Sequence, residues 1–438
     1  MAKSIDIKKT ISPFSKILKI SGDKSLSIRW ALTASQADGK SRAYNLLMSE
    51  DILSTLKCLK KLGVKIKIKK KYCEINGLGL NGFKYKKNLI LNAGNSGTLG
   101  RLILGLLVKS PFKIKLIGDK SLSKRDFSRV IIPLKKFGAK FFPKNKSTLP
   151  ILIKGSNTLK PINYYEKKGS AQCKSSIMYA ALNVPGKTII KAKKSRDHTE
   201  ILFKNLNLPI KVKKEKNHDL IKLEGKKNIK SFNYNIPSDI SSSAFFIVLT
   251  LLSKNSNLII KNVNINPSRT GVITILNKMG GKIKIKNRKI YKGEKTADIY
   301  VRSAKKLKSI NCPKILNSSA IDEFLIIFLV AAKAKGVSIF EDLGELNKKE
   351  SPRLDIAVRF LKMIGIKVFR KKNNIKIYGN PNLNLKNKYY LKNYLKDHRV
   401  FMMSCITALI FGGNWKIHDK DSIKTSFPSF LKIVSSLN

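Results

Sequence analysis

Cationic and hydroxyl side chains recur in this chain beside short polar turns that open into apolar segments. In GDKSLSIR, Lys24, Ser25 and Arg29 place two cations and a hydroxyl at a predicted helix start. Ser25 and Arg29 share one face of that helix because they are four residues apart, and Ser25 is also an N-cap candidate. In NSGTLGR, Gly97 lets the backbone approach a ligand and Arg101 follows one turn later. Groups of these types bind anions.

Three further segments carry the same types of side chain. They are GDKSLSKRDFSRV with Arg125 and Arg129, SAQCKSS with Ser170 and Gln172, and KKSRDHTE with Ser195, Arg196 and His198. A hydrated or salt-bridged surface would explain any one of these segments equally well. Only their combination indicates a binding site.

Acidic residues are scarce, which makes their positions informative. The chain has 27 Asp and Glu against 89 Lys and Arg. In IDEF, Asp322 and Glu323 stand directly before a long apolar run, although acids in a first helical turn are also favoured by the helix dipole. These carboxylates are candidates for proton transfer or for binding hydroxyl groups.

Two other polar segments combine acids with cations. NKKESPRLD contains Lys349, Glu350 and Arg353, and predicts Ser351 as an N-cap with Pro352 as the first helical residue. DHR contributes Asp397, His398 and Arg399 at another predicted helix start. Each segment is weak evidence alone.

The elements that must position these residues form an internal repeat. Six polar turns, spaced about 70 to 80 residues apart, each open into an apolar helix. The six segments are GDKSLSIRWAL from Gly22, NSGTLGRLILGLL from Asn95, SAQCKSSIMYAAL from Ser170, SDISSSAFFIVLTLL from Ser238, IDEFLIIFLVAA from Ile321 and DHRVFMMSCITALI from Asp397. Each helix start offers free backbone N–H groups and the positive end of the dipole. Six such ends facing one cleft would bind anions strongly.

A second pattern follows each apolar helix: a strand with alternating Lys and Ile or Val, an amphipathic helix, and another strand. The amphipathic helices are predicted to end at left-handed residues, namely Gly63, Gly138, Asn207, Gly280 and Gly365. The sixth unit, FPSFLKIVSSLN, lacks a following strand, and the N-terminal segment SIDIKKTISPF is the spare piece that completes it.

This count predicts two domains of three repeats each. Residues 21–237 would form an inserted domain, and residues 1–20 together with 238–438 a discontinuous one. We expect the active-site cleft to lie between them. A chain with 42% hydrophobic residues can bury cores of this size.

Composition excludes several classes of protein. The formal net charge of +62 would suit nucleic-acid binding, but lysine is spread over every segment, as in KKLGVKIKIKKKYCEI, which favours a genome-wide bias. Five scattered cysteines predict neither a metal site nor a disulfide framework, and are expected to be reduced and mostly buried. No secretory signal or bilayer-long apolar run is evident, so we expect a cytoplasmic protein with no membrane or nucleic-acid partner.

Taken in order, the motifs resemble one family along nearly the whole chain. GDKSxSxR, NxGTxxR, GDxSLxxR, SAQxKS, SRDHTE, PxDxSSAxFF, NPxRTG, IDE, KESxRL, DHR and TSFP are similar to the successive signatures of 5-enolpyruvylshikimate-3-phosphate synthase, in the bacterial form often called class II. The resemblance covers about residue 14 to the last residues. It implies an α/β fold: a two-domain inside-out α/β barrel built from six βαβαββ repeats, the enolpyruvyl transferase fold.

The resemblance also implies a reaction. Family members transfer the enolpyruvyl group of phosphoenolpyruvate to the 5-hydroxyl of shikimate 3-phosphate (EC 2.5.1.19), in the shikimate pathway to chorismate and the aromatic amino acids. Phosphate leaves through a tetrahedral addition intermediate, without metal or organic cofactor. Both substrates carry a phosphate and a carboxylate, which matches a site rich in Arg, Lys and helix termini. A monomer that closes on its substrates is expected.

The resemblance also implies a role for individual residues of this chain that match the family's motifs. Lys24, Ser25 and Arg29 would contact shikimate 3-phosphate, with Lys24 also near phosphoenolpyruvate. The phosphate and ring hydroxyls would be held by Ser170, Ala171, Gln172, Ser195 and Arg196, and phosphoenolpyruvate by Gly97, Arg125, Arg353 and Arg399. Asp322 would accept the 5-hydroxyl proton with Lys349 beside it, and Glu350 or Lys24 would protonate the methylene carbon. The sequence does not choose between these two acids.

Three positions depart from the family pattern. Pro352 replaces the usual Asp of KESDRL, Asp126 follows Arg125 where Pro is usual, and Ile28 replaces a commonly polar residue. Asp126 is therefore expected to neutralise Arg125 partly. None of the three is assigned to proton transfer.

Three other interpretations remain open at this point. A sibling enolpyruvyl transferase acting on a UDP-sugar shares the fold, but usually carries a cysteine on a mobile loop and lacks the pairing of KESxRL with DHR. A basic nucleic-acid-binding repeat protein would interleave cations with aromatic platforms, whereas Phe and Tyr here lie mostly in apolar runs. An inactive homologue is disfavoured because every proposed charged residue is present.

Overall fold

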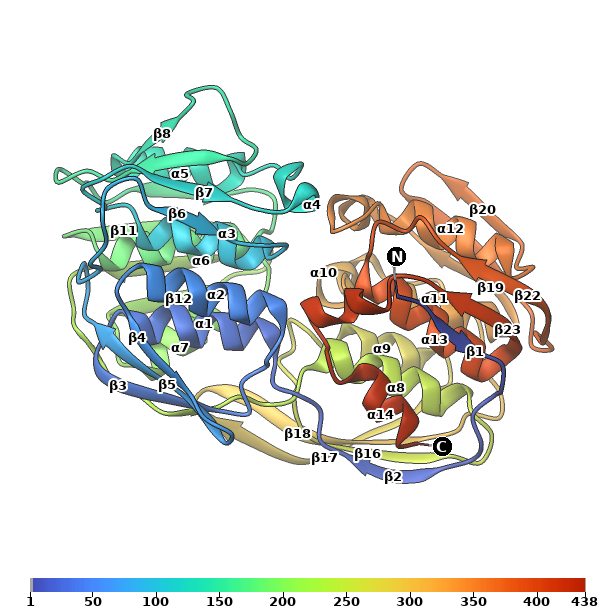
Figure 1. Ribbon diagram of the computed structural model, residues 1–438. Coiled ribbons are helices and arrows are strands. Elements are labelled where there is room, and N and C mark those ends of the chain that lie inside the picture. Colours follow the sequence, from blue (N-terminus) through green and yellow to red (C-terminus); the bar gives the residue numbers. More distant parts are fainter. Residues whose placement is uncertain (1–2, 438) are drawn as a thin grey trace. The chain divides into compact units, whose positions relative to one another are not determined.

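The computed structural model describes residues 3–437 and divides into two compact units (Figure 1). Unit 1 comprises Met1–Ser21, Pro237–Ile290 and Lys295–Asn438, and unit 2 comprises Gly22–Ile236 and Tyr291–Glu294. Each unit has its own hydrophobic core. Within residues 3–437, every helix is too short or too polar to span a bilayer.

Six helices, each starting at one of the predicted polar turns, form the centres of the units. They are α1 (Lys24–Ser35), α3 (Gly97–Leu106) and α6 (Ala171–Leu182) in unit 2, and α8 (Ile240–Leu252), α11 (Phe324–Lys333) and α13 (His398–Phe411) in unit 1. Nearly all residues of these helices are buried, as their continuous apolar sequences predict. The sequence prediction of six apolar helices is confirmed.

Other helices accompany the central ones. Unit 2 contains α2 (Glu50–Lys61), α4 (Lys120–Ser123), α5 (Ser128–Phe137) and α7 (His198–Asn205), and unit 1 contains α9 (Gly271–Lys278), α10 (Asn317–Ala320), α12 (Arg353–Met363), α14 (Phe430–Ser435) and the 3-10 segments Lys314–Leu316, Gly344–Lys348 and Lys420–Thr425. The five predicted left-handed residues after the amphipathic helices all have positive φ, from 55° at Asn207 to 115° at Gly138.

Three sheets surround the helices of unit 2. Their strand orders are β14-β3-β5-β4 with β15 also on β3, β6-β7-β9-β8, and β10-β11-β13-β12. The strands are β3 (Ala37–Tyr44), β4 (Lys65–Ile68), β5 (Tyr72–Leu78), β6 (Ile90–Asn92), β7 (Ile114–Ile117), β8 (Lys140–Phe142), β9 (Ile151–Lys154), β10 (Asn163–Glu166), β11 (Lys187–Lys193), β12 (Ile210–Lys214), β13 (His218–Glu224), β14 (Ile229–Lys230) and β15 (Tyr234–Asn235). In the second and third of these sheets, the two strands of a parallel pair flank one buried helix along the chain, and antiparallel strands follow.

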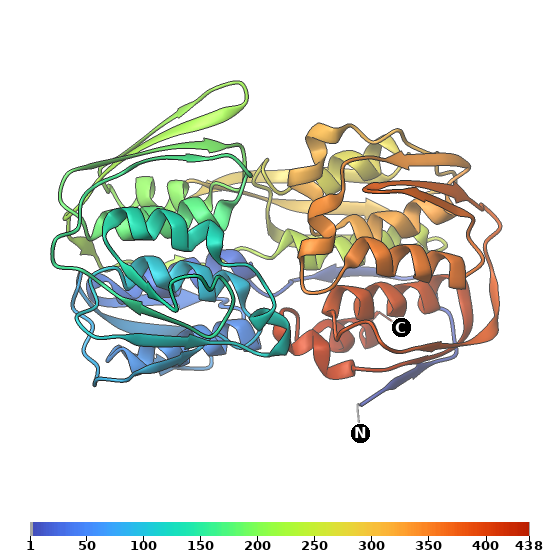
Figure 2. The ribbon, with the colours of Figure 1, turned by 90° about the horizontal axis from the view of Figure 1, so that it is seen from above.

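Three sheets likewise surround the helices of unit 1, as Figures 1 and 2 show for each unit. Their strand orders are β17-β18-β16-β2, β19-β21-β20 and β1-β23-β22. The strands are β1 (Ile5–Ile7), β2 (Ser15–Leu18), β16 (Asn257–Asn264), β17 (Lys282–Tyr291), β18 (Glu294–Arg302), β19 (Gly336–Phe340), β20 (Val368–Lys371), β21 (Asn374–Gly379), β22 (Leu385–Leu391) and β23 (Gly412–Ile417). The βαβαββ repeat and the inside-out arrangement of helices within sheets match the expected fold class.

The N-terminal strand completes the last repeat, as the sequence predicts. Strand β1 pairs antiparallel with β23, with Ile5 opposite Ile417 and Ile7 opposite Trp415. Strand β2 pairs parallel with β16, next to the fourth buried helix. The first repeat of unit 2 obtains its leading strands, β14 and β15, from the end of the Gly22–Ile236 segment, a pairing that the sequence pattern does not predict.

Helix boundaries correct three expectations. Helix α1 is capped by Asp23, whose Oδ1 accepts from Leu26 N at 2.9 Å, instead of by Ser25. Helix α12 begins at Arg353 with Pro352 one residue before it, and Ser351 is not its N-cap. Helix α11 begins at Phe324, so both IDEF carboxylates precede the helix.

The buried helices of unit 2 approach one another closely. A Cβ at Gly105 of α3 would lie only 2.2 Å from the carbonyl oxygen of Ser176 in α6, so glycine is required there. Thr33 of α1 and Tyr179 of α6 are joined by a 2.9 Å hydrogen bond between their hydroxyls. One pair of polar side chains between these buried helices is thus hydrogen-bonded.

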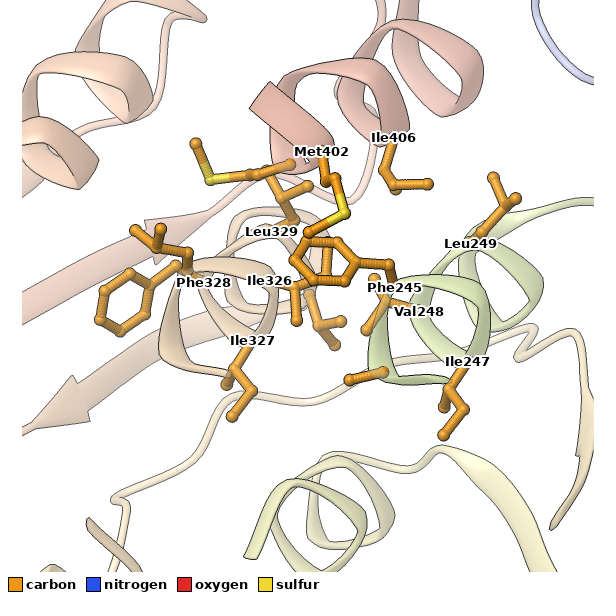
Figure 3. Close-up of a cluster of buried hydrophobic side chains, with 14 of the residues drawn as sticks. Phe245, Ile247, Val248, Leu249, Ile326, Ile327, Phe328, Leu329, Met402 and Ile406 are labelled. Atoms are coloured by element: carbon orange, nitrogen blue, oxygen red, sulfur yellow. The ribbon is translucent and has the colours of Figure 1, made fainter. Parts of the chain in front are cut away.

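The core of unit 1 is formed by three facing helices. Figure 3 shows Phe245 and Leu249 of α8, Ile326 and Leu329 of α11, and Met402 of α13 packed together. Phe245 is 1% exposed and meets the Phe430 ring edge-on at 6.2 Å.

Replacing Phe245 tests this core. Phe245→Ala should lower the free energy of unfolding by about 3–5 kcal/mol because it removes a buried ring and leaves a cavity. Phe369→Ala on β20 is the matched control, since Phe369 is 54% exposed and should change stability little. Calorimetric unfolding of both variants measures the difference, and equal effects would contradict the assignment of the core.

Candidate active site

Within each unit, the helix N-termini that carry the predicted site residues lie at one end. In unit 2, Gln172 at the start of α6 accepts from Arg101 of α3, and Arg29 of α1 donates to Thr199 at the start of α7. In unit 1, Arg399 at the start of α13 donates to the carbonyl of Asp322, just before α11. Each unit therefore carries one polar, cation-rich cluster at its helix N-termini.

Arg29 is a buried cation with only neutral partners. Its guanidinium donates to Thr199 Oγ1 at 2.8 Å, Ser175 Oγ at 3.1 Å and the Ser25 carbonyl at 3.1 Å. Among residues 3–437 no carboxylate lies within ion-pairing distance of it, although Arg29 is only 3% exposed. Burial lowers the pKa of Arg29 for this reason. A bound anion would relieve this cost.

Ser195 and Arg196 lie in the loop before α7, close to Arg29. The positive charge of Arg196 contributes to lowering the pKa of Arg29, after burial and against nearby acidic groups. The Ser195 hydroxyl is buried and has no hydrogen-bond partner in the described chain. Two cations and a free hydroxyl are what a phosphate group requires.

The start of α3 forms a second cationic group. A Cβ at Gly97 would lie 3.0 Å from Nη1 of both Arg101 and Arg125, so the two guanidinium groups lie over this glycine. Arg101 donates to Gln172 Oε1 at 2.8 Å and its guanidinium lies 4.9 Å from the Phe127 ring centroid. The backbone at Gly97 and both cations thus lie together at one helix N-terminus.

The remaining unit 2 residues are placed as follows. Ser170 is the N-cap of α6, where its hydroxyl accepts from Cys173 N at 3.2 Å, and Ala171 is the first helical residue. Lys24, the first residue of α1, pairs with Asp51 of α2 at 3.1 Å. Ser25 supplies its carbonyl to Arg29.

In unit 1 the predicted residues form one connected group. The Asp322 carboxylate lies 3.3 Å from Lys349 Nζ and 3.6 Å from Arg353 Nη1, and its side chain is 15% exposed. Lys349 thus lies beside Asp322. An exposed edge leaves this carboxylate accessible to a substrate hydroxyl.

Arg353 joins the two acid-containing motifs. It donates to Asp397 Oδ2 at 2.9 Å and to Glu350 Oε2 at 2.6 Å, and Ser351 Oγ donates to the same Asp397 oxygen at 2.8 Å. Burial alone would lower the pKa of Arg353, but Asp397, Glu350 and Asp322 together raise it. The pKa of Asp397 is lowered: burial acts to raise it, and Arg353 outweighs burial. The guanidinium of Arg353 is therefore largely occupied within the protein.

Arg399 lies beside the same group and is less enclosed by acids. Its Nη1 donates to the Asp322 carbonyl at 2.7 Å and lies 3.7 Å from Glu323 Oε1. Its backbone N–H donates to Asp397 at 2.9 Å, which caps α13.

The expectation that Asp126 partly neutralises Arg125 is wrong. Asp126 does not pair with Arg125; its carboxylate accepts from the backbone and hydroxyl of Ser128 at 2.8 and 2.5 Å. Burial acts to raise the pKa of Asp126, but hydrogen bonds from Ser128 and Ser147 and the charge of Arg129 lower it overall. Asp126 thus stabilises the start of α5, while Arg125 donates to Asn95 Oδ1 at 3.3 Å. Ile28 is fully buried in α1.

Sequence reasoning missed several charged residues of these clusters. Lys174 of α6 and Glu200 of α7 form a buried ion pair at 2.5 Å, and Asp51 pairs with Lys24. Lys174 resembles dozens of surface lysines in the sequence, so composition hides it. The acids were detectable only as helix first-turn residues in a chain poor in acids.

The cysteines are free and buried, as predicted. Burial raises the pKa of Cys58, Cys73 and Cys173 to about 12 and that of Cys312 to about 11. None of the five thiols is therefore suited to act as the loop cysteine expected of a UDP-sugar transferase.

Comparison with solved structures shows which fold the chain shares. The enolpyruvyl transferase NikO from Streptomyces tendae superimposes with a TM-score of 0.77 at 12% identity, covering 100% of this chain and 98% of that one, which shows a shared fold. EPSP synthase from Acinetobacter baumannii superimposes with a TM-score of 0.87 at 34% identity, covering 99% of this chain and 98% of that one. The fold is thus that of the enolpyruvyl transferases.

Sequence comparison identifies the family. The model of the EPSP synthase (3-phosphoshikimate 1-carboxyvinyltransferase) family matches residues 8–434. A 3-phosphoshikimate 1-carboxyvinyltransferase of Vesicomyosocius okutanii is 41% identical over 96% of this chain and 94% of its own length, and one of Caldicellulosiruptor bescii is 39% identical over 94% of each. The chain belongs to the EPSP synthase family.

The Arg353–Asp397 pair generates a test of stability. Asp397→Asn should destabilise the protein by about 3–5 kcal/mol at neutral pH, because the buried guanidinium loses its carboxylate partner. Since the pKa of Asp397 is lowered in the folded protein, its contribution is complete above the ordinary Asp pKa of about 4 and is lost as the pH falls below it. Urea unfolding across pH should show the gap between wild type and Asp397→Asn narrowing on acidification. A gap independent of pH would contradict the ion pair.

Proposed function

We propose that this chain transfers the enolpyruvyl group of phosphoenolpyruvate to the 5-hydroxyl of shikimate 3-phosphate, giving 5-enolpyruvylshikimate 3-phosphate and phosphate. Its substrates are anionic small molecules, as its family membership implies. The structural observation that best supports this function is Arg29, a buried guanidinium whose hydrogen-bond acceptors are all neutral. An anionic ligand is the partner that such a cation requires.

Unit 2 would bind the phosphorylated ring and part of phosphoenolpyruvate. Arg29, Ser195 and Arg196 would hold the phosphate of shikimate 3-phosphate, because they combine charge with a free buried hydroxyl. The other proposed contacts to this substrate come from Lys24, Ser25, Ser170, Ala171 and Gln172. Gly97 and Arg125, grouped at the start of α3, would bind phosphoenolpyruvate.

Unit 1 would supply the base and the remaining cations. In the addition step, the 5-oxygen bonds to C2 of phosphoenolpyruvate, its proton passes to Asp322, and C3 gains a proton. Elimination then breaks the bond from C2 to the phosphate oxygen while C3 loses a proton. Lys349 would orient Asp322, and Arg353 and Arg399 would stabilise the negative charge of phosphoenolpyruvate.

Proton transfer at C3 involves two candidate groups. Lys24 pairs with Asp51, and Glu350 pairs with Arg353. A lysine ammonium group can donate a proton and a carboxylate can accept one, so Lys24 would donate in addition and Glu350 would accept in elimination.

Cytoplasmic location and a monomeric state remain predictions from the sequence, as does a mechanism without metal or organic cofactor. The two clusters are proposed to act on the same pair of substrates.

Phosphate release measures the proposed activity directly. Purified protein given phosphoenolpyruvate and shikimate 3-phosphate should release phosphate, and omission of either substrate should abolish the signal. A UDP-sugar acceptor in place of shikimate 3-phosphate should give no turnover. Folded protein that turns over only the UDP-sugar, or neither acceptor, would refute the proposal.

Asp322→Asn tests the proposed base. The change should lower kcat by about 10²–10⁴-fold, because the amide cannot accept the hydroxyl proton. Asp421→Asn in the same unit is the control, since Asp421 is a surface carboxylate paired only with a neighbouring lysine, and it should leave kcat unchanged. A loss of only about twofold in Asp322→Asn would exclude its role as base.

A further inference from the structure

The loop before α7 carries Ser195 and Arg196 but has no regular structure of its own. It spans residues 194–197, between strand β11 and helix α7. Its N-cap, Asp197, makes no side-chain capping bond and instead pairs with Lys214 at 3.0 Å. The geometry of the loop must therefore be set by contacts from surrounding elements.

Two of these contacts come from the neighbouring helices. Lys174 Nζ lies 2.5 Å from Glu200 Oε1 and 3.5 Å from the Ser195 carbonyl, and its side chain is fully buried. Thr199 receives Arg29 Nε at 2.8 Å and shares a 2.7 Å hydrogen bond with Ser175. These contacts fix the loop on the side of α1 and α6.

A further contact beside the loop comes from a residue almost a hundred positions away. His198 Nδ1 lies 2.7 Å from Glu294 Oε1, and the two side chains are 0% and 1% exposed. Glu294 belongs to the turn Tyr291–Glu294, the only part of the β17–β18 hairpin that is assigned to unit 2. A buried His–Glu pair at the first residue of α7 restricts how the preceding loop can lie.

The hairpin turn is itself attached to unit 2. Tyr291 Oη accepts from Asn235 N at 2.9 Å, and its ring meets Tyr234 edge-on at 5.5 Å. Lys292 Nζ donates to the Asn233 carbonyl. A Cβ at Gly293 would lie 2.8 Å from the Ile201 side chain of α7, so the turn packs directly on this helix.

We propose that Glu294 and His198 are positioning residues for the phosphate of shikimate 3-phosphate, through which the β17–β18 turn holds Ser195 and Arg196 in their binding geometry. The inference rests on the proposed function, since it assigns the phosphate to this loop. The free, buried Ser195 hydroxyl is the atom that this positioning would present to the ligand. Neither His198 nor Glu294 is proposed to contact the substrate.

The experiment compares substrate affinities across matched variants. Glu294→Ala should raise both the Kd of shikimate 3-phosphate, measured by calorimetry, and its KM by about tenfold, as expected for the loss of about one hydrogen bond from the bound state. The KM of phosphoenolpyruvate should stay within about twofold of the wild-type value. Glu294→Gln should recover most of the affinity, because its amide oxygen can still accept from the His198 Nδ1–H.

The chain offers a control with the same chemistry. Glu215, just after β12, and His218, the first residue of β13, form a second Glu–His pair at 2.6 Å in unit 2, but their side chains are 31% and 24% exposed. Glu215→Ala should therefore leave both KM values unchanged. If Glu294→Ala does not fold, Tyr291→Phe removes one attachment of the turn and should raise the Kd in the same direction by a smaller factor.

The outcomes separate the two proposals. An unchanged Kd for shikimate 3-phosphate in folded Glu294→Ala, or in Tyr291→Phe when the former does not fold, overturns the positioning role. An equal rise in both KM values also overturns it, because that result indicates only a general structural effect. Wild-type protein that binds shikimate 3-phosphate but does not turn over refutes the proposed function, while the calorimetric comparison still decides the role of Glu294.

Discussion

The constraint on which this structure depends is the termination of six fully buried helices. A helix that buries every face leaves its first N–H groups without partners, so the chain must supply polar side chains, a ligand, or both at that end. Asp23, Ser96, Ser170, Asp239 and Asp397 cap five of the six N-termini. Because these caps do not satisfy all the N–H groups, the same ends are suited to bind anions.

The buried arginines of the two clusters have different kinds of partner. In unit 2, Arg29 is buried among hydroxyls and a carbonyl, so an anion from outside the protein would balance its charge. In unit 1, Arg353 is already bonded to Asp397 and Glu350. The first arrangement suits recognition of a phosphate, whereas the second holds a carboxylate such as Asp322 in a fixed position. This division agrees with a substrate-binding role for one cluster and a proton-transfer role for the other.

Much of the fold is predictable from the sequence because local residue patterns determine its helices and strands. Continuous apolar runs predict the six buried helices, and left-handed residues such as Gly138 predict where helices end. The prediction that the surplus N-terminal strand belongs to the last repeat is also confirmed. Helix starts were less predictable. Asp23 and Ser25 are both capping residues, and only the three-dimensional path of the backbone selects one of them.

The candidate site was predictable only where its residues stand in motifs. Contacts such as Lys174–Glu200 and His198–Glu294 join residues that share no local pattern, and in a lysine-rich chain one buried lysine looks like any other. The prediction for Asp126 is wrong for the same reason. Asp126 is adjacent to Arg125 in the sequence, but its carboxylate accepts hydrogen bonds from Ser128.

The pairing of β1 with β23 has a consequence for biosynthesis. Ile5 leaves the ribosome more than four hundred residues before its partner Ile417 exists, so this sheet is among the last parts of unit 1 able to form. Unit 2 draws almost all its residues from Gly22–Ile236 and can assemble much earlier during translation. Until the C-terminal residues emerge, the apolar side of the newborn N-terminal strand lacks its native cover, which makes it a natural site for chaperone protection.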